Sequence, residues 1–96
     1  MLTNAKIYTS HYGAHGADTL HPQYEVRGSH IYSTIYNPAG RKPLPDYEIR
    51  GTKVYTTMHH PDGRQAHPWF EIRGNELHTT MHHPNGRSDM AVFHMR

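Results

Sequence analysis

The sequence predicts an all-β fold: an antiparallel meander of about eight strands from four 23-residue β-hairpin units. A motif of an aromatic residue, Glu, Val or Ile, Arg and Gly recurs every 23 residues, starting at Tyr24, Tyr47 and Phe70. Each copy continues into a second segment rich in β-branched and aromatic residues, which is typical of strands. Each unit then closes on a Pro-X-Gly-Arg sequence, at residues 38–41, 61–64 and 84–87.

These motifs divide the chain into units in order. The whole chain is expected to be one repeat domain, residues 1–96, with full units at 22–41, 45–64 and 68–87. Residues 1–16 contain a second-strand segment and residues 90–96 a first-strand segment, so together they form a split fourth unit. We expect the two ends to pair with each other.

A short glycine turn sets the register inside each unit. Gly51-Thr52 and its counterparts match a two-residue type II′ turn, which has glycine at its first central position. With that turn, Ile49 lies opposite Val54, and the other units also place apolar residues opposite each other. In the split unit, Met95 would lie opposite Ile7 and close the sheet into a barrel-like ring without exposed edges. The alternative is an open stack whose ends fall in the middle of a unit.

The 23-residue period, the Tyr-Glu opening and the Asp-Gly turn at Asp62-Gly63 resemble MORN repeats. The resemblance implies an open stack of hairpins. It also implies a scaffold that binds proteins or lipid, and not an enzyme.

The composition and charge of the chain argue against several classes of function and location. Only 34% of the residues are hydrophobic, the mean hydropathy is −0.89, and there is no cysteine to form disulfides or thiolate metal sites. The N-terminal residues lack the apolar run of a signal peptide, and no segment has membrane-spanning length, so we expect a cytoplasmic protein without membrane contact. A formal charge of +2 gives nucleic-acid binding little support.

Strand alternation predicts an inward and an outward face. The inward face would carry Tyr24, Val26, Ile31, Ser33 and Ile35, with the matching positions of the other units. The outward face combines Tyr, Arg and Glu, and Tyr and Arg are enriched at protein interfaces. Its candidate interface residues are Arg27, Tyr32, Tyr36, Arg50, Tyr55 and Arg73. The alternative is a solvated face whose side chains only bond to each other.

The long loops would gather at one end of the meander with most of the 11 histidines. These are His11, His15, His21, His59, His60, His67, His82 and His83. Alternation places His11, His60 and His83 toward the core side, where three imidazoles could hold a metal such as Zn or Ni. The alternative is that these side chains only fill the strand ends. Because imidazole titrates near pH 6.5, pH-responsive assembly is a further possibility.

No catalytic motif is present: paired carboxylates, a nucleophile motif and a Gly-rich phosphate loop are all missing from the sequence. We therefore expect that the protein is not an enzyme and that it binds no cofactor apart from a possible metal. The sequence favours a small binding or scaffold module that acts through its outward face or its histidine-rich loops, on a protein partner or on a second copy of itself.

Overall fold

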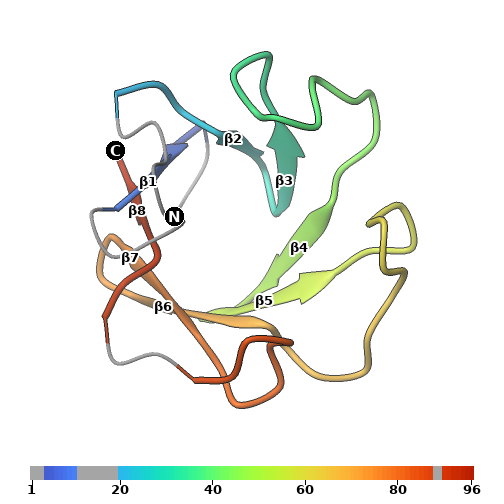
Figure 1. The fold of residues 1–96 in the computed structure, drawn as a ribbon, viewed down its shortest axis with the longest axis vertical. Helices are drawn as coiled ribbons and strands as arrows, with labels where there is room; N and C mark the ends of the chain where they lie inside the picture. The colour runs from blue at the N-terminus through green and yellow to red at the C-terminus, as the bar shows by residue number, and fades with distance from the viewer. Residues whose placement is uncertain (1–3, 11–19, 88–89) are drawn as a thin grey trace.

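A computed structural model describes residues 4–10, 20–87 and 90–96, and it is an antiparallel β-barrel (Figure 1). Each strand pairs with its neighbours in sequence, and the first strand pairs with the last. The strands are β1 (Lys6–Thr9), β2 (Tyr24–Arg27), β3 (His30–Ser33), β4 (Tyr47–Arg50), β5 (Lys53–Thr56), β6 (Phe70–Arg73), β7 (Glu76–Thr79) and β8 (Phe93–Met95). The predicted closed meander is confirmed. The open stack, which the MORN resemblance also implied, is wrong.

The predicted register is found in all four hairpins. Ile49 lies opposite Val54 in the β4–β5 hairpin, and the β2–β3 and β6–β7 hairpins repeat this arrangement. Between β1 and β8, Ile7 lies opposite Met95. The two ends of the chain therefore form a hairpin like the other three.

A positive φ angle marks the short turns. Gly28, Gly51 and Gly74 have φ angles of 63°, 61° and 62°, as a type II′ turn requires at its first central position. In the split hairpin, Asn4 takes the same place with a φ of 65°. Asparagine enters this left-handed region more readily than most residues, so it can replace the glycine here.

Neighbouring hairpins join along shorter ladders, in which a first-strand aromatic lies opposite an aliphatic residue. Tyr47 pairs with Ile31, and Phe70 pairs with Val54. The inward apolar side chains therefore form three sets of four, beside the buried hydroxyl-bearing residues Thr9, Ser33, Thr56 and Thr79. The middle set is Ile7, Ile31, Val54 and Leu77; the set near the short turns is Val26, Ile49, Ile72 and Met95.

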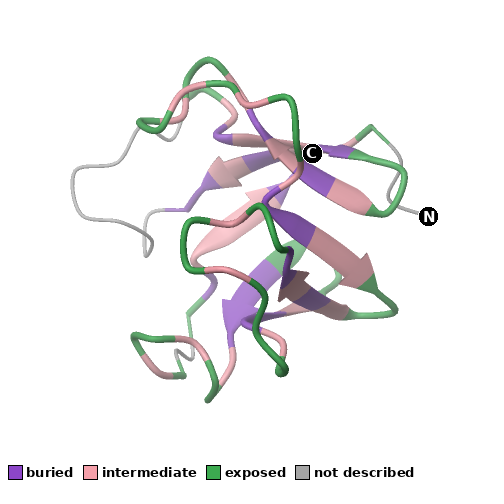
Figure 2. Ribbon diagram, turned by 90° about the vertical axis from the view of Figure 1, so that its right-hand side faces the viewer, coloured by how far each residue is buried: buried purple, intermediate pink, exposed green. Residues whose placement is uncertain are grey.

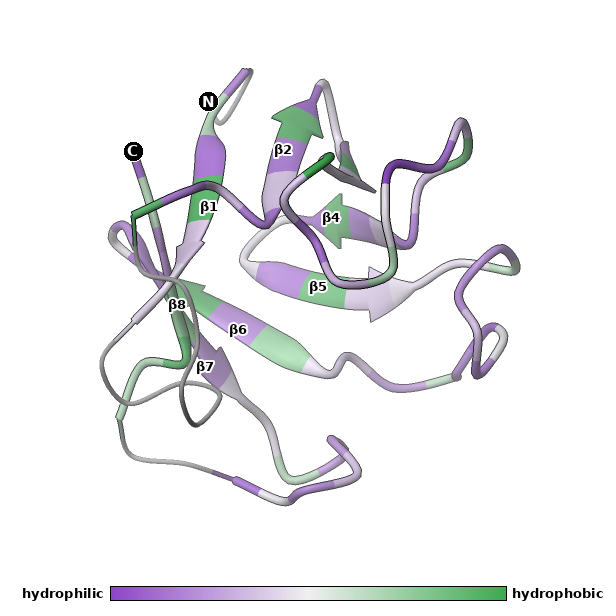
Figure 3. Ribbon diagram, turned by 45° about the horizontal axis from the view of Figure 1, so that its top comes forward, coloured by the Kyte–Doolittle hydropathy of each residue, from purple (hydrophilic) through white to green (hydrophobic). Residues whose placement is uncertain are grey.

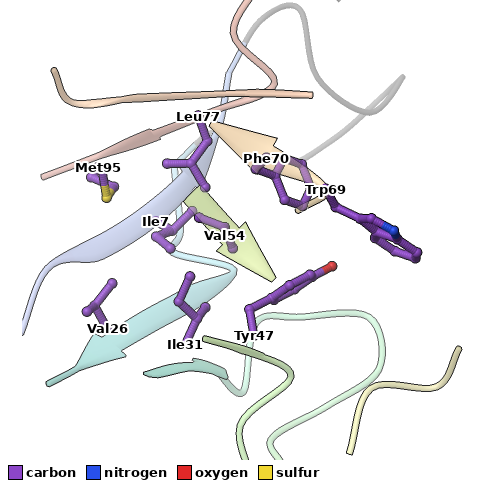
Figure 4. Close-up of a cluster of buried hydrophobic side chains, with 9 residues drawn as sticks. All are labelled: Ile7, Val26, Ile31, Tyr47, Val54, Trp69, Phe70, Leu77 and Met95. Carbon is purple, nitrogen blue, oxygen red and sulfur yellow. The ribbon is translucent and has the colours of Figure 1, made fainter. Parts of the chain in front are cut away.

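The third set is a ring of aromatic side chains at the end of the barrel that carries the long loops. Tyr24, Tyr47, Phe70 and Phe93 follow one another edge to face, with neighbouring ring centroids 5.7–5.8 Å apart. Figure 4 shows Tyr47 and Phe70 toward one end of the core and Met95 and Val26 toward the other. The space between this ring and the middle set is only about 10 Å³, roughly one water molecule. Between these two sets of described side chains, the interior is packed.

Burial follows the strand alternation but not into the loops (Figure 2). Hydropathy alternates in the same way along strands such as β5 and β6 (Figure 3). Val26, Ile31 and Ser33 are buried as predicted, whereas Ile35 is 67% exposed. Met58 and Met81, at the matching positions, are 70% and 75% exposed. The prediction that these positions belong to the core is wrong, because β3, β5 and β7 end two residues earlier and a turn begins. None of the described residues belongs to a helix long and apolar enough to cross a membrane.

Candidate functional site

Each described long loop begins with two consecutive tight turns. In the loop after β5, the amide of His60 donates to the carbonyl of Thr57 (3.1 Å), and the amide of Gly63 donates to the carbonyl of His60 (2.8 Å). The loops after β3 and β7 have the same pair of bonds. Proline at the first central position of the second turn favours this geometry. The first turn forces Met58 away from the core.

A threonine hydroxyl ties each first turn to the segment that leads into the first strand of the same hairpin. The hydroxyl of Thr57 donates to the carbonyl of Pro45 (2.6 Å) and accepts the amide of His59 (3.2 Å). Thr34 and Thr80 make the same two bonds in their loops, and Ser10 donates to the carbonyl of Ala91. This repeated bond explains why Thr57 is buried, although strand alternation continued past Thr56 would put it on the outward face.

In each second turn, the side chain of the residue before the proline accepts a hydrogen bond from a backbone amide of the same turn. Nδ1 of His60 accepts the amide of Asp62 (3.0 Å), and Nδ1 of His83 accepts the amide of Asn85 (3.0 Å). In the loop after β3, Oδ1 of Asn37 accepts the amide of Ala39 (2.9 Å). Asparagine and histidine thus fill one structural position because both present an acceptor at the same place.

His60 and His83 also pack against the circle of four aromatic side chains at the long-loop end of the barrel. The His60 ring lies edge to face against Tyr47 (5.1 Å), and the His83 ring lies the same way against Phe70 (5.2 Å). Trp69 contacts both imidazoles, at 5.0 Å and 5.2 Å. Burial among these rings lowers the pKa of His60 and of His83, because the charged imidazolium loses hydration there.

This packing bears on the predicted metal site. His60 and His83 lie at the same end of the barrel, as predicted, but each presents Nδ1 to a backbone amide and its ring to Trp69. Among the described residues, no group of three or more His, Asp or Glu side chains is placed to hold a metal ion. His11 and His15 lie outside the described residues, so the three-histidine site stays a prediction.

The outward face is tied together by its own side chains. Arg27 lies over the ring of Tyr32 (4.6 Å), Arg50 lies over Tyr55 (4.5 Å), and both arginines also bind a neighbouring glutamate. Arg73 binds Glu71 (3.1 Å). The guanidinium groups therefore cover the tyrosine rings on one side, and base stacking there would have to displace them.

Tyr36 lies apart from the other predicted interface residues. It sits in the loop after β3, is 48% exposed and stacks on His21 at 4.5 Å. His67 and His82 form the matching stacked pair in the third unit, at 4.2 Å. The six predicted interface residues are therefore divided between the strand face and the loops, and their role stays a prediction.

The structure adds a groove where the outward face meets a long loop. Its volume is about 330 Å³, and we call it the larger groove. Cationic, apolar and hydroxyl-bearing side chains from β5, β6, β7 and the following loop line it: Lys53, Pro68, Glu71, Arg73, Thr79, Thr80, Met81, His82 and Arg87.

A second groove repeats the first one unit earlier. This smaller groove, of about 130 Å³, is lined by His30, Pro45, Glu48, Thr57, Met58, His59 and Arg64. Every one of these positions lies 23 residues before a residue of the larger groove. The lining residues differ in type at one position, where His30 replaces Lys53. Two residues of the larger groove, Arg73 and Thr79, have counterparts, Arg50 and Thr56, that do not line the smaller groove.

Four exposed lining residues, Met58, Met81, Arg64 and Arg87, are not among the site residues that the sequence predicts. Strand alternation predicts a core position for the methionines, and the arginines belong to the turn motif. The recurrence of arginine after Gly63 and Gly86 was the available signal, because the turn itself requires only the proline and the glycine.

No protein-family model matches this sequence, and neither the curated proteins nor the solved structures yield a match. The MORN resemblance therefore gains no support from these comparisons.

Proposed function

We propose that this protein is a non-enzymatic binding module that takes up a segment of a partner protein in its repeated surface grooves. The observation that carries this proposal is the same groove built in two consecutive units, each with an exposed methionine and an arginine. A filled barrel serves as the rigid support, and loops on a rigid support are a common place for binding residues.

The lining side chains favour a macromolecular ligand over a small molecule. Met58 and Met81 are 70% and 75% exposed, although methionine usually lies in a core. Methionine and arginine are both enriched at protein interfaces, and methionine adapts its shape to different partners. Neither Arg64 nor Arg87 forms an ion pair or a hydrogen bond with a described residue.

Selection from a displayed peptide library tests this proposal. The bait is the full chain, and the matched control is a variant with Met58, Arg64, Met81 and Arg87 all changed to alanine. All four side chains are exposed, so we expect the variant to fold, and its circular dichroism spectrum should match the wild type.

We expect peptides that the wild type enriches and the variant does not. A library that yields no enriched peptide, or peptides that bind both proteins equally, would contradict binding in the grooves.

A further inference from the structure

We infer that the larger groove binds an acidic peptide segment, in which a carboxylate stands beside an apolar side chain. This inference rests on the proposed function and names the chemistry of its ligand.

The larger groove contains more cationic than anionic groups. Lys53, Arg73 and Arg87 line it together with a single carboxylate, Glu71, which leaves two excess positive charges (3 − 1) with His82 neutral. Glu71 uses one oxygen for Lys53 (2.7 Å) and the other for Arg73 (3.1 Å). These two bonds lower the pKa of Glu71, so it stays ionised and holds both cations at the groove.

Several donors in the groove are still available to a ligand. Lys53 has three N–H donors and Arg73 has five, and Glu71 occupies only part of them. Arg87 binds none of the described residues. Guanidinium and ammonium donors form their strongest hydrogen bonds with anions, and a carboxylate fits the planar fork of arginine.

The ligand is also expected to carry an apolar side chain, because Met81 and Pro68 line the same groove. A ligand that covers the exposed methionine gains by removing apolar surface from water. A peptide with acidic and apolar side chains in alternation satisfies both parts. Nucleic acid fits less well, because Arg27 and Arg50 already cover the rings of Tyr32 and Tyr55 on which bases could stack.

The smaller groove serves as an internal comparison. Arg64 is its only arginine or lysine lining residue, because His30 stands in place of Lys53 and Arg50 does not line it, so it presents fewer cationic groups to a ligand when its histidines are neutral. Acidic peptides should therefore bind mainly at the larger groove. Loss of the Arg87 side chain should weaken peptide binding more than loss of the Arg64 side chain.

The experiment titrates the full-length protein near pH 7 with fluorescent eight-residue peptides of alternating glutamate and leucine. Peptides with glutamine in place of glutamate, and with serine in place of leucine, are the matched ligands, and an eight-nucleotide oligothymidine is the nucleic-acid probe. Charge-assisted hydrogen bonds predict at least about tenfold weaker binding of the glutamine peptide. The serine peptide should bind several-fold more weakly because it leaves Met81 uncovered.

Three variants locate the site. Arg87→Gln should weaken the glutamate–leucine peptide about tenfold, whereas Arg64→Gln should change its affinity less than about threefold. Arg27→Gln removes the same charge outside both grooves and should leave affinity within about twofold. Equal losses in all three variants would mean that only net charge matters, and would overturn the site.

The remaining outcomes separate this inference from the proposed function. Equal affinity for the glutamine peptide would overturn the acidic ligand but leave a peptide-binding groove. If oligothymidine bound more tightly than the peptide, the ligand of the larger groove would be nucleic acid and not an acidic peptide. If the measured mass rose with protein concentration in the wild type but not in Met81→Ala, a second copy of the chain would fill the groove. Absence of binding by these peptides and by every library peptide would overturn both proposals.

Discussion

His60 and His83 stabilise their turns only in the neutral form. Because Nδ1 of His60 accepts the amide of Asp62, its proton is carried on Nε2, which lies 3.2 Å from the Tyr47 hydroxyl. Protonation of Nδ1 would remove that acceptor and place a charge among the rings of Tyr47 and Trp69. The turn and the aromatic contacts thus depend on the same protonation state.

This dependence predicts a loss of stability in mild acid. The folded-state pKa of both histidines lies below their ordinary value of about 6.5, so the unfolded chain binds protons first as pH falls. The stabilisation is complete above about pH 6.5 and is lost as pH falls from there toward the lower folded-state pKa. Urea unfolding between pH 8 and 5 measures this slope.

The matched variant is His60→Asn/His83→Asn, because Asn37 makes the same turn bond in the first unit without titrating. The variant should lose part of the slope that wild type shows below pH 6.5. An unchanged slope would assign the acid sensitivity to other histidines.

The left-handed residue in each short turn gives a second prediction at this scale. Gly51 has a φ of 61°, and a methyl group added there would meet no atom within 4 Å. Gly51→Ala should therefore lower the free energy of unfolding by about 1–2 kcal/mol through backbone strain alone. At the matching position, Asn4→Gly should leave stability unchanged or raise it by less than about 1 kcal/mol.

Thermal unfolding of both variants tests this equivalence. A substantial loss of stability in Asn4→Gly would show that the asparagine side chain, and not its backbone conformation, matters in the split hairpin.

At the scale of the elements, the sequence predicts strands and register well but loops poorly. Ile49 opposite Val54 follows from the glycine turn and from the need to bury both residues, and these constraints are local. Ile35 and Met58 were misplaced because apolar character continues past the end of the strand. Only the hydrogen bonds from Thr34 and Thr57 reveal that the chain turns there.

The grooves were unpredictable for a different reason. Lys53 and Arg87 line the same groove although they are 34 residues apart, and no periodicity within one unit brings them together. The His60 and His83 turns could have been anticipated in part, since Asn37 occupies the same position and asparagine commonly caps its own turn.

The threonine bond between loop and strand gives a prediction at the element scale. Thr57→Val keeps the side-chain volume but removes the donor to Pro45, leaving a carbonyl partly unsatisfied, so it should cost about 1–2 kcal/mol. Thr57→Ser retains the hydroxyl, as Ser10 does in the split hairpin, and should cost clearly less.

Equilibrium denaturation of both Thr57 variants supplies the measurement. If Thr57→Ser were as destabilising as Thr57→Val, the methyl group and not the hydrogen bond would be the stabilising part.

At the scale of the whole molecule, closure explains how a chain with 34% hydrophobic residues builds a core. Each hairpin contributes three inward apolar residues, and only the closed ring brings the four contributions together. The aromatic ring is complete only when Phe93 meets Tyr24 (5.8 Å), which requires β8 beside β1. Closure also removes the exposed strand edges that promote aggregation.

The most direct test of this account is a nuclear Overhauser measurement between the Hα protons of Ile7 and Met95. Lys6 and Arg96 exchange both backbone hydrogen bonds (2.9 Å each), so Ile7 and Met95 form the next, non-hydrogen-bonded pair, whose Hα protons lie close together. The closed barrel predicts a strong cross-peak that survives dilution and is absent from isotope-filtered spectra of mixed labelled and unlabelled chains. No cross-peak, or one that arises only between chains, would contradict the closed four-hairpin barrel.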